Sequence, residues 1–92
     1  MIVGTLRVRL LIREAKSLKD KRQVVKSIKD KLHNSFNVSV AEVEEQDHRN
    51  LAVLGFAMVS NEAHHLKQAL SQVVEALRGH PVAEFLDYEL EV

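Results

Sequence analysis

Residues 51–59 read LAVLGFAMV, and this run is the best guide to the architecture of the chain. Neighbouring positions such as Val53 and Leu54 are both apolar, so both sides of the run are hydrophobic. A strand that is apolar on both sides is typical of the interior of a sheet rather than of its edge. We therefore predict a central strand here, although the pattern does not show which of its two sides is covered.

Three further runs alternate with the period of two that a half-buried strand requires. They span residues 6–12, 36–43 and 85–92. In the last run, Leu86, Tyr88 and Leu90 share one side. We expect these three side chains to face the core.

Two amphipathic helices are predicted between the strands. Apolar residues recur at helical spacing over residues 18–34, and Ser17 is placed as an N-cap with Asp20 three residues later, a variant of the capping box. A second helix is predicted over residues 63–77, where Gly79 occupies the position of a left-handed C-cap residue.

The predicted order of elements is βαββαβ. Each helix has one apolar face, and the two faces together match one apolar side of a sheet. The sequence therefore predicts an α+β, ferredoxin-like sandwich: one domain over residues 1–92, with a four-stranded antiparallel sheet of order 4-1-3-2 and both helices on one face.

Composition excludes several classes of protein. The chain has 92 residues, 46% hydrophobic and 28% charged, a balance typical of a globular domain. It contains no run of 18 apolar residues that would span a membrane, and its start lacks the pattern of a signal peptide. With no cysteine there is no disulfide, thiolate nucleophile or cysteine-based zinc site. We expect a cytoplasmic protein without cofactor or metal, and not an enzyme.

The net charge of zero conceals two halves of opposite sign. Residues 1–33 contain ten Lys and Arg against three acids, a balance of +7, and residues 34–92 contain three against ten, a balance of −7. Such asymmetry suggests an anionic partner. The alternative is that the two halves neutralise each other within one fold.

The predicted first helix carries a row of cations beside its apolar stripe. The row consists of Lys19, Arg22, Lys26, Lys29 and His33, spaced three, four, three and four residues apart, which places them on one flank. The acids of this helix are expected to point elsewhere. A basic helix start with a serine cap is also a reasonable phosphate site. The candidate anion-binding set is Lys16, Ser17, Lys19, Lys21, Arg22, Lys26 and Lys29. The alternative is a solvated lysine face that serves only solubility.

The arginines of the first strand are not included in that set. Arg7 and Arg9 are predicted to face the acids Asp87 and Glu89 of the last strand, and pairs across strands stabilise a sheet. An RNA-binding sheet of the stacking type is not expected, because exposed aromatic residues are too few. The histidines lack the spacing of a metal site.

Several short segments resemble the YlxP-like proteins, a bacterial family without a defined function. They are residues 17–22 (SLKDKR), 36–42 (FNVSVAE), Gln46-Asp47, Leu54-Gly55 and Ser60-Asn61. These proteins often carry a Trp where this chain has Arg49. The resemblance implies a ferredoxin-like fold and a gene neighbourhood of transcription-termination, translation-initiation and ribosome-maturation factors, which suggests work on RNA or the ribosome. It implies no catalytic residues.

Two functional hypotheses follow from the sequence. The first is a non-enzymatic factor that binds the phosphate backbone of RNA, free or in the ribosome, along the first helix. The second is a protein-interaction or small-ligand-binding module of the same fold. The uncovered side of the sheet is expected to form a homodimer interface, with Leu11, Val43, Val53, Ala57 and Val59. The alternative is a monomer whose loops partly cover a modest apolar patch.

Overall fold

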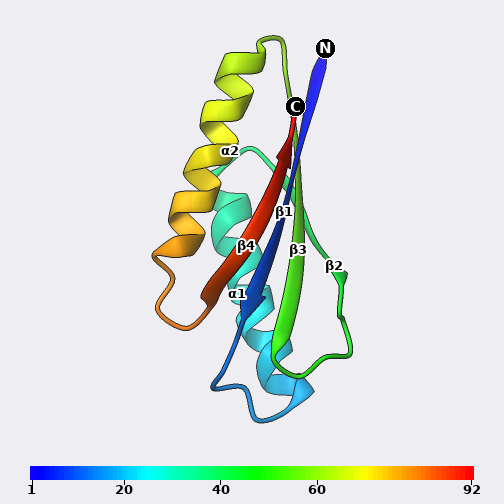
Figure 1. Cartoon of the computed structure of the whole chain (residues 1–92), viewed down its shortest axis with the longest axis vertical. Coiled ribbons are helices and arrows are strands. Elements are labelled where there is room, and N and C mark those ends of the chain that lie inside the picture. The colour runs from blue at the N-terminus through cyan, green and yellow to red at the C-terminus, as the bar shows by residue number, and fades with distance from the viewer.

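A computed structural model describes all 92 residues and has the predicted βαββαβ order (Figure 1). The elements are β1 (Ile2–Leu11), α1 (Leu18–Ser35), β2 (Ser39–Glu44), β3 (Leu51–Ser60), α2 (Ala63–Arg78) and β4 (Glu84–Glu91). Neither helix has the length and the apolar run that a membrane crossing requires.

The four strands form one antiparallel sheet in the order β2-β3-β1-β4, as predicted. β3 pairs with β1 along the full length of both strands, from Ile2 opposite Ser60 to Leu11 opposite Leu51. The apolar run at residues 51–59 is therefore an interior strand, which confirms the prediction.

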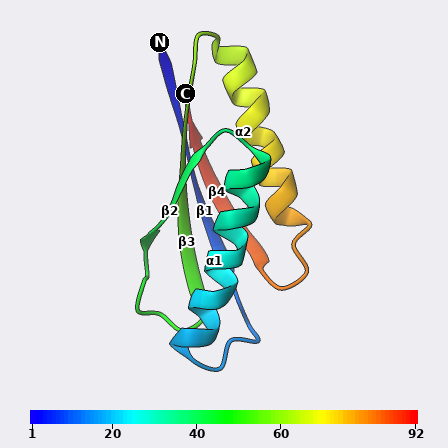
Figure 2. The same cartoon turned by 180° about the vertical axis from the view of Figure 1, so that it is seen from behind.

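Both helices cover the same face of the sheet (Figures 1 and 2). α1 packs beside β2, and α2 packs across β1, β3 and β4. Close approach of α2 depends on Gly4, because a Cβ atom there would lie 2.9 Å from the side chains of Leu66 and Leu70. The core between the two layers includes Leu6, Val8, Leu10, Val25, Ile28, Leu54, Phe56, Leu66, Leu70 and Leu77.

The core also shows which side of β3 is uncovered. Leu54 and Phe56 face the helices and belong to the core cluster, whereas Val53 does not belong to it. The alternate residues of β3, Val53, Gly55 and Ala57, therefore lie on the open face of the sheet.

The expectation that Leu86 faces the core is wrong. Asp87 pairs with Arg9 but Phe85 pairs with the next residue, Leu10, so Leu86 is the extra residue of a β-bulge. Phe85 packs against the core and Leu86 is 40% exposed. Strict alternation fails at a bulge because one added residue exchanges the two sides of the strand.

The start of α1 follows the sequence, and the end of α2 does not. Ser17 is the N-cap of α1, and its Oγ accepts a hydrogen bond from the Asp20 backbone N–H at 3.1 Å, as predicted. Gly79 ends α2 with φ −84° and ψ 0°, not in the left-handed conformation, and its N–H bonds the Glu75 carbonyl in helical fashion. The chain turns away only after that, at His80 and Pro81.

Candidate nucleic-acid interface

The predicted basic flank exists on α1. The side chains of Lys19, Arg22 and Lys26 are exposed and that of Lys29 is half-buried, and Lys16 is exposed just before the helix. The row lies beside the β2 edge of the sheet, since Lys29 shares a small hollow with Ser39 and Val40 of β2. Figure 2 shows α1 lying over one face of the sheet, with β2 at the edge of that sheet.

The prediction that Lys21 belongs to this anion-binding surface is wrong. Its side chain is fully buried, and its Nζ donates to the Glu45 backbone carbonyl at 2.7 Å. Nζ also lies 2.7 Å from Oε2 of Glu42, whose side chain is 13% exposed. This contact is a close ion pair, although its angles fall outside those of a regular hydrogen bond.

Spacing alone could have identified this buried lysine. Lys21 precedes Val25 by four residues and Ile28 by seven, the separations that place residues on one face of a helix. It therefore lies in the apolar stripe of α1. There it joins the first turns of the helix to β2 and to the loop after β2, where Glu45 has a positive φ of 60°.

The N-terminus of α1 is occupied by the chain itself. The Ser17 hydroxyl serves as the helix cap, and the Asp20 carboxylate accepts a hydrogen bond from the Lys16 backbone N–H at 3.1 Å. A carboxylate at this position already satisfies the preference of a helix start for negative charge. Ser17 therefore has a structural role, and the flanking lysines are the groups that remain available to an anion.

The flank contains one acid, contrary to expectation. Lys26 Nζ lies 2.7 Å from Asp30 Oδ2, one turn further along α1. This hydrogen bond and the charge of Lys26 lower the pKa of Asp30, and the same contact raises the pKa of Lys26. Arg22 has a more distant partner in Asp47 of the β2–β3 loop, at 3.8 Å.

Ion pairs divide the cations of the protein into two groups. Seven of the thirteen Lys and Arg residues have a carboxylate within 4.0 Å: Arg7, Arg9, Arg13, Lys21, Arg22, Lys26 and Arg78. The six without an ion pair are Lys16, Lys19, Lys29, Lys31, Arg49 and Lys67. Only Lys67 lies on α2, so the unpaired cations are concentrated on α1 and in the two loops beside its start.

The β1 arginines are paired across strands, as predicted. Arg9 lies 2.7 Å from Asp87, and Arg7 lies 3.9 Å from Glu89. The sequence did not indicate the shortest contact of Arg7, at 2.6 Å to Glu44 on β2, which reaches across β3. Beyond the end of β1, a hydrogen bond to Glu84 and the charge of that carboxylate raise the pKa of Arg13.

The open face of the sheet holds the residues expected at a dimer interface. Val43, Ala57 and Val59 are exposed there and Leu11 is half-buried, but Val53 is only 1% exposed. Val53 pairs with Arg9 on one side and Glu44 on the other, and both partners are fixed in ion pairs. Including Val53 in a contact surface was therefore wrong, because it is already buried within the monomer.

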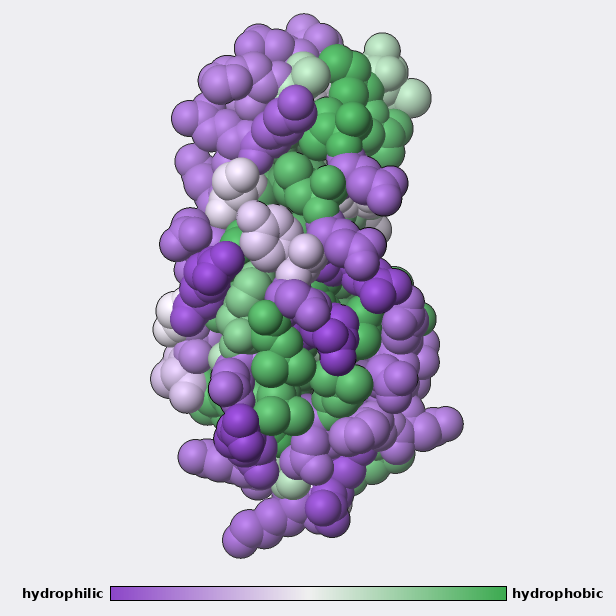
Figure 3. Space-filling view, viewed as in Figure 1, coloured by the Kyte–Doolittle hydropathy of each residue, from purple (hydrophilic) through white to green (hydrophobic).

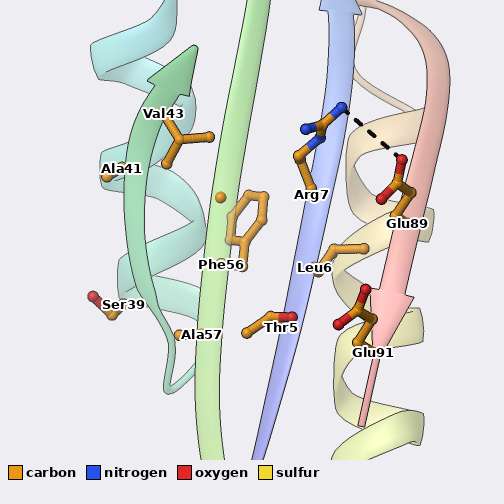
Figure 4. A pocket seen from close by; sticks show the side chains of 11 residues that line it. Thr5, Leu6, Arg7, Ser39, Ala41, Val43, Phe56, Ala57, Glu89 and Glu91 are labelled. Atoms are coloured by element: carbon orange, nitrogen blue, oxygen red, sulfur yellow. Dashed lines mark ion pairs between the residues drawn. The ribbon is translucent and has the colours of Figure 1, made fainter.

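A groove of about 430 Å³ crosses this face (Figure 4). Three small residues form its floor: Ala41, Gly55 and Ala57. A Cβ atom on Gly55 would lie 2.8 Å from Val43 Cγ1. Polar side chains stand at its β1 and β4 side: Thr5, Arg7, Glu89 and Glu91. Figure 3 shows hydrophobic surface near the N-terminal end of the sheet, separated by hydrophilic side chains from a second hydrophobic area.

Comparison with known proteins shows the family of this chain. A family model described as "Protein of unknown function (DUF503)" matches residues 3–90. The chain belongs to this family. A relative, the "Uncharacterized protein YlxP" of Bacillus subtilis (strain 168), is 32% identical over 83 residues, which cover 90% of each chain. The resemblance to YlxP-like proteins is thereby confirmed, and with it a family whose function is uncharacterised.

Proposed function

We propose that the protein is a non-enzymatic factor that binds the phosphate backbone of RNA, free or within the ribosome, along the exposed flank of α1. The observation that supports this proposal is the concentration of unpaired cations on α1 and beside its start. An exposed cation without a carboxylate partner attracts a phosphate at full strength, whereas an ion-paired cation must first give up its partner.

The flank has the dimensions of a short backbone contact. From Lys19 to Lys29 it covers ten residues, about 15 Å at the helical rise of 1.5 Å per residue. Arg22 and Lys26 lie between these ends, and their exposed, weak pairs with Asp47 and Asp30 can exchange for a phosphate. Such a surface reads the position of the backbone rather than the bases.

The aromatic residues favour backbone binding over base stacking. Phe56 is buried, and Phe36 and Phe85 pack against the core. Tyr88 is partly exposed, but the Arg78 guanidinium lies 5.9 Å from its ring. Since base stacking requires free ring faces, charge is the means of recognition that α1 offers.

The test is the affinity for a fluorescently labelled single-stranded RNA, measured by anisotropy. We expect the double variant Lys19→Glu/Lys29→Glu to bind at least about tenfold more weakly at low salt, since two phosphate contacts become repulsions. The control matched in net charge is Lys31→Glu/Lys67→Glu, which reverses two unpaired exposed lysines outside the flank and should leave the affinity within about twofold. Equal losses in both variants would reduce the effect to net charge and refute the assignment to α1.

The second candidate function is a protein- or small-ligand-binding module, and the groove on the open face favours it. A thermal-shift screen against nucleotides and metabolites distinguishes the two, because a ligand that binds only the folded state raises the melting temperature. A ligand whose stabilising effect is lost in Ala57→Leu, which fills the groove, would support this function. The rise in melting temperature that the same ligand causes should be unchanged in Lys19→Glu.

A further inference from the structure

A second cationic surface lies at the end of the molecule where α1 begins. The β1–α1 loop and the β2–β3 loop enclose a shallow hollow of about 540 Å³. It is lined by Leu11, Arg13, Ala15, Lys16, His48, Arg49 and Asn50. Three of these residues are cations and none is an acid, so every charged side chain that lines the hollow is positive.

The floor of this hollow is rigid because Asn50 joins the two loops. Its Nδ2 donates to the backbone carbonyls of Ile12 at 2.9 Å and Ala15 at 3.0 Å. The backbone carbonyl of Asn50 accepts a hydrogen bond from the Ile12 N–H at 2.8 Å. One side chain and its backbone thus hold both loops in a fixed relation. Binding an ion there costs little ordering of the backbone.

His48 is fixed in the tautomer that donates from Nε2. Its Nδ1 accepts hydrogen bonds from the backbone N–H groups of Asn50 at 3.0 Å and Leu51 at 2.8 Å. A ring nitrogen that accepts carries no proton, so in the neutral ring the proton is on Nε2. That N–H belongs to a residue lining the hollow and has no partner in the protein.

The cations of the hollow differ in their availability. Lys16 and Arg49 have no ion pair, and Arg49 is oriented by a long contact from its Nε to Asn50 Oδ1 at 3.4 Å, which leaves its terminal nitrogens unused. Arg13 is 2.7 Å from Glu84 but remains 70% exposed. A free guanidinium fork beside an ammonium is a strong arrangement for an oxyanion with several oxygens.

We propose that this hollow binds a single phosphate group, held by Arg49, Lys16 and the Nε2–H of His48. The hollow adjoins the start of the α1 flank and shares Lys16 with the candidate anion-binding set, but it is tested independently of RNA binding along α1. The phosphate belongs either to the backbone or end of an RNA or to a small phosphorylated metabolite, since the chemistry of recognition is the same.

The site can be tested by titrating inorganic phosphate into isotope-labelled protein and following backbone amide signals by NMR, at constant ionic strength with chloride. We expect saturable shifts in the millimolar range at residues 13–16 and 48–50. Arg49→Ala should weaken binding at least tenfold, and Arg49→Lys, which keeps the charge but not the fork, should have an intermediate affinity. Lys67→Ala is the matched control and should bind like the wild type.

The source of the phosphate is distinguished by two further titrations, with adenosine monophosphate and with a short single-stranded RNA lacking a terminal phosphate. Tighter binding of the nucleotide than of inorganic phosphate assigns the hollow to a small metabolite, and competition of the RNA for the same amides assigns it to RNA backbone. Shifts that grow linearly without saturation, or that persist in Arg49→Ala, overturn the site. Neither outcome bears on the proposed RNA binding along α1, which the anisotropy of Lys19→Glu/Lys29→Glu tests separately.

Discussion

The arginines of β1 and the lysines of α1 carry the same charge in different surroundings. Arg7 and Arg9 lie in a sheet whose last strand supplies acids at matching register, and each ends at a carboxylate. Lys19 and Lys29 lie on the flank of α1 and neither has an ion pair, because the β2 acid that faces this helix, Glu42, is paired with the buried Lys21. Net charge along the sequence therefore says little about binding until the topology shows which charges are already neutralised.

Lys21 marks one extreme of this comparison, since it is the cation whose pairing matters most to the fold. We expect Glu42→Gln to destabilise the protein by about 3 kcal/mol, because it leaves a buried ammonium without a counter-charge. Urea denaturation measures the loss. The double variant Lys21→Met/Glu42→Leu should recover most of it, because no buried charge remains. A change below about 1 kcal/mol in Glu42→Gln would contradict the role given to this pair.

The open face of the sheet, which carries the ion-paired arginines of β1, is also the surface proposed for self-association. A dimer through the open face predicts twice the monomer mass of 10.4 kDa by light scattering at micromolar concentration. Val59→Glu should return the mass to that of the monomer, because Val59 is 55% exposed on this face. Val82→Glu, at a similarly exposed valine outside the sheet, is the control. A monomer mass for the wild type across a dilution series would exclude the dimer.

Removing a β1 arginine is expected to have a smaller effect, and on stability alone. Arg9→Ala should cost about 0.5 kcal/mol, the range of exposed cross-strand pairs, and should leave RNA affinity unchanged. Lys19→Ala should show the reverse, with unchanged stability and weaker RNA binding. Urea denaturation and RNA anisotropy on the same two proteins provide the check. If Arg9→Ala weakens RNA binding as much as Lys19→Ala does, the distinction between paired and unpaired cations is wrong.

The smallest effect concerns Lys31, which is unpaired but faces away from the flank. Burial lowers the pKa of His80 and the charge of Lys31 lowers it further, while His80 Nδ1 accepts the N–H groups of Val82 and Ala83 at 3.2 Å. Because the unfolded chain takes up this proton first, stability should fall as the pH drops below about 6.5.

An NMR titration should place the pKa of His80 below 6.5 in the wild type and slightly higher in Lys31→Gln. The exposed His64 and His65 serve as internal references. A His80 pKa at or above 6.5 would contradict both causes.

Much of the fold was predictable from sequence, because apolar periodicity indicates the type of each element and, except in β3, which is apolar on both sides, the side that is covered. The β4 bulge was not, since its extra residue breaks the alternation on which the prediction at Leu86 rested. Within the site, the exposed lysines were found by spacing, but Lys21 was assigned by its charge when its position in the apolar stripe already indicated burial. The Arg49 hollow has no local signal, because Asn50 joins there two loops whose bonded residues, Ile12 and Ala15, lie 38 and 35 positions earlier in the chain.

The salt dependence of RNA binding tests the role of the unpaired lysines. In a plot of log affinity against log salt concentration, each contact between a cation and a phosphate of a single strand contributes about 0.7 to the slope. We expect Lys19→Gln/Lys29→Gln to reduce the slope by about 1.4, and Arg7→Gln/Arg9→Gln to leave it unchanged. The same slope in the wild type and the α1 variant, or a loss in the β1 variant instead, would contradict the account.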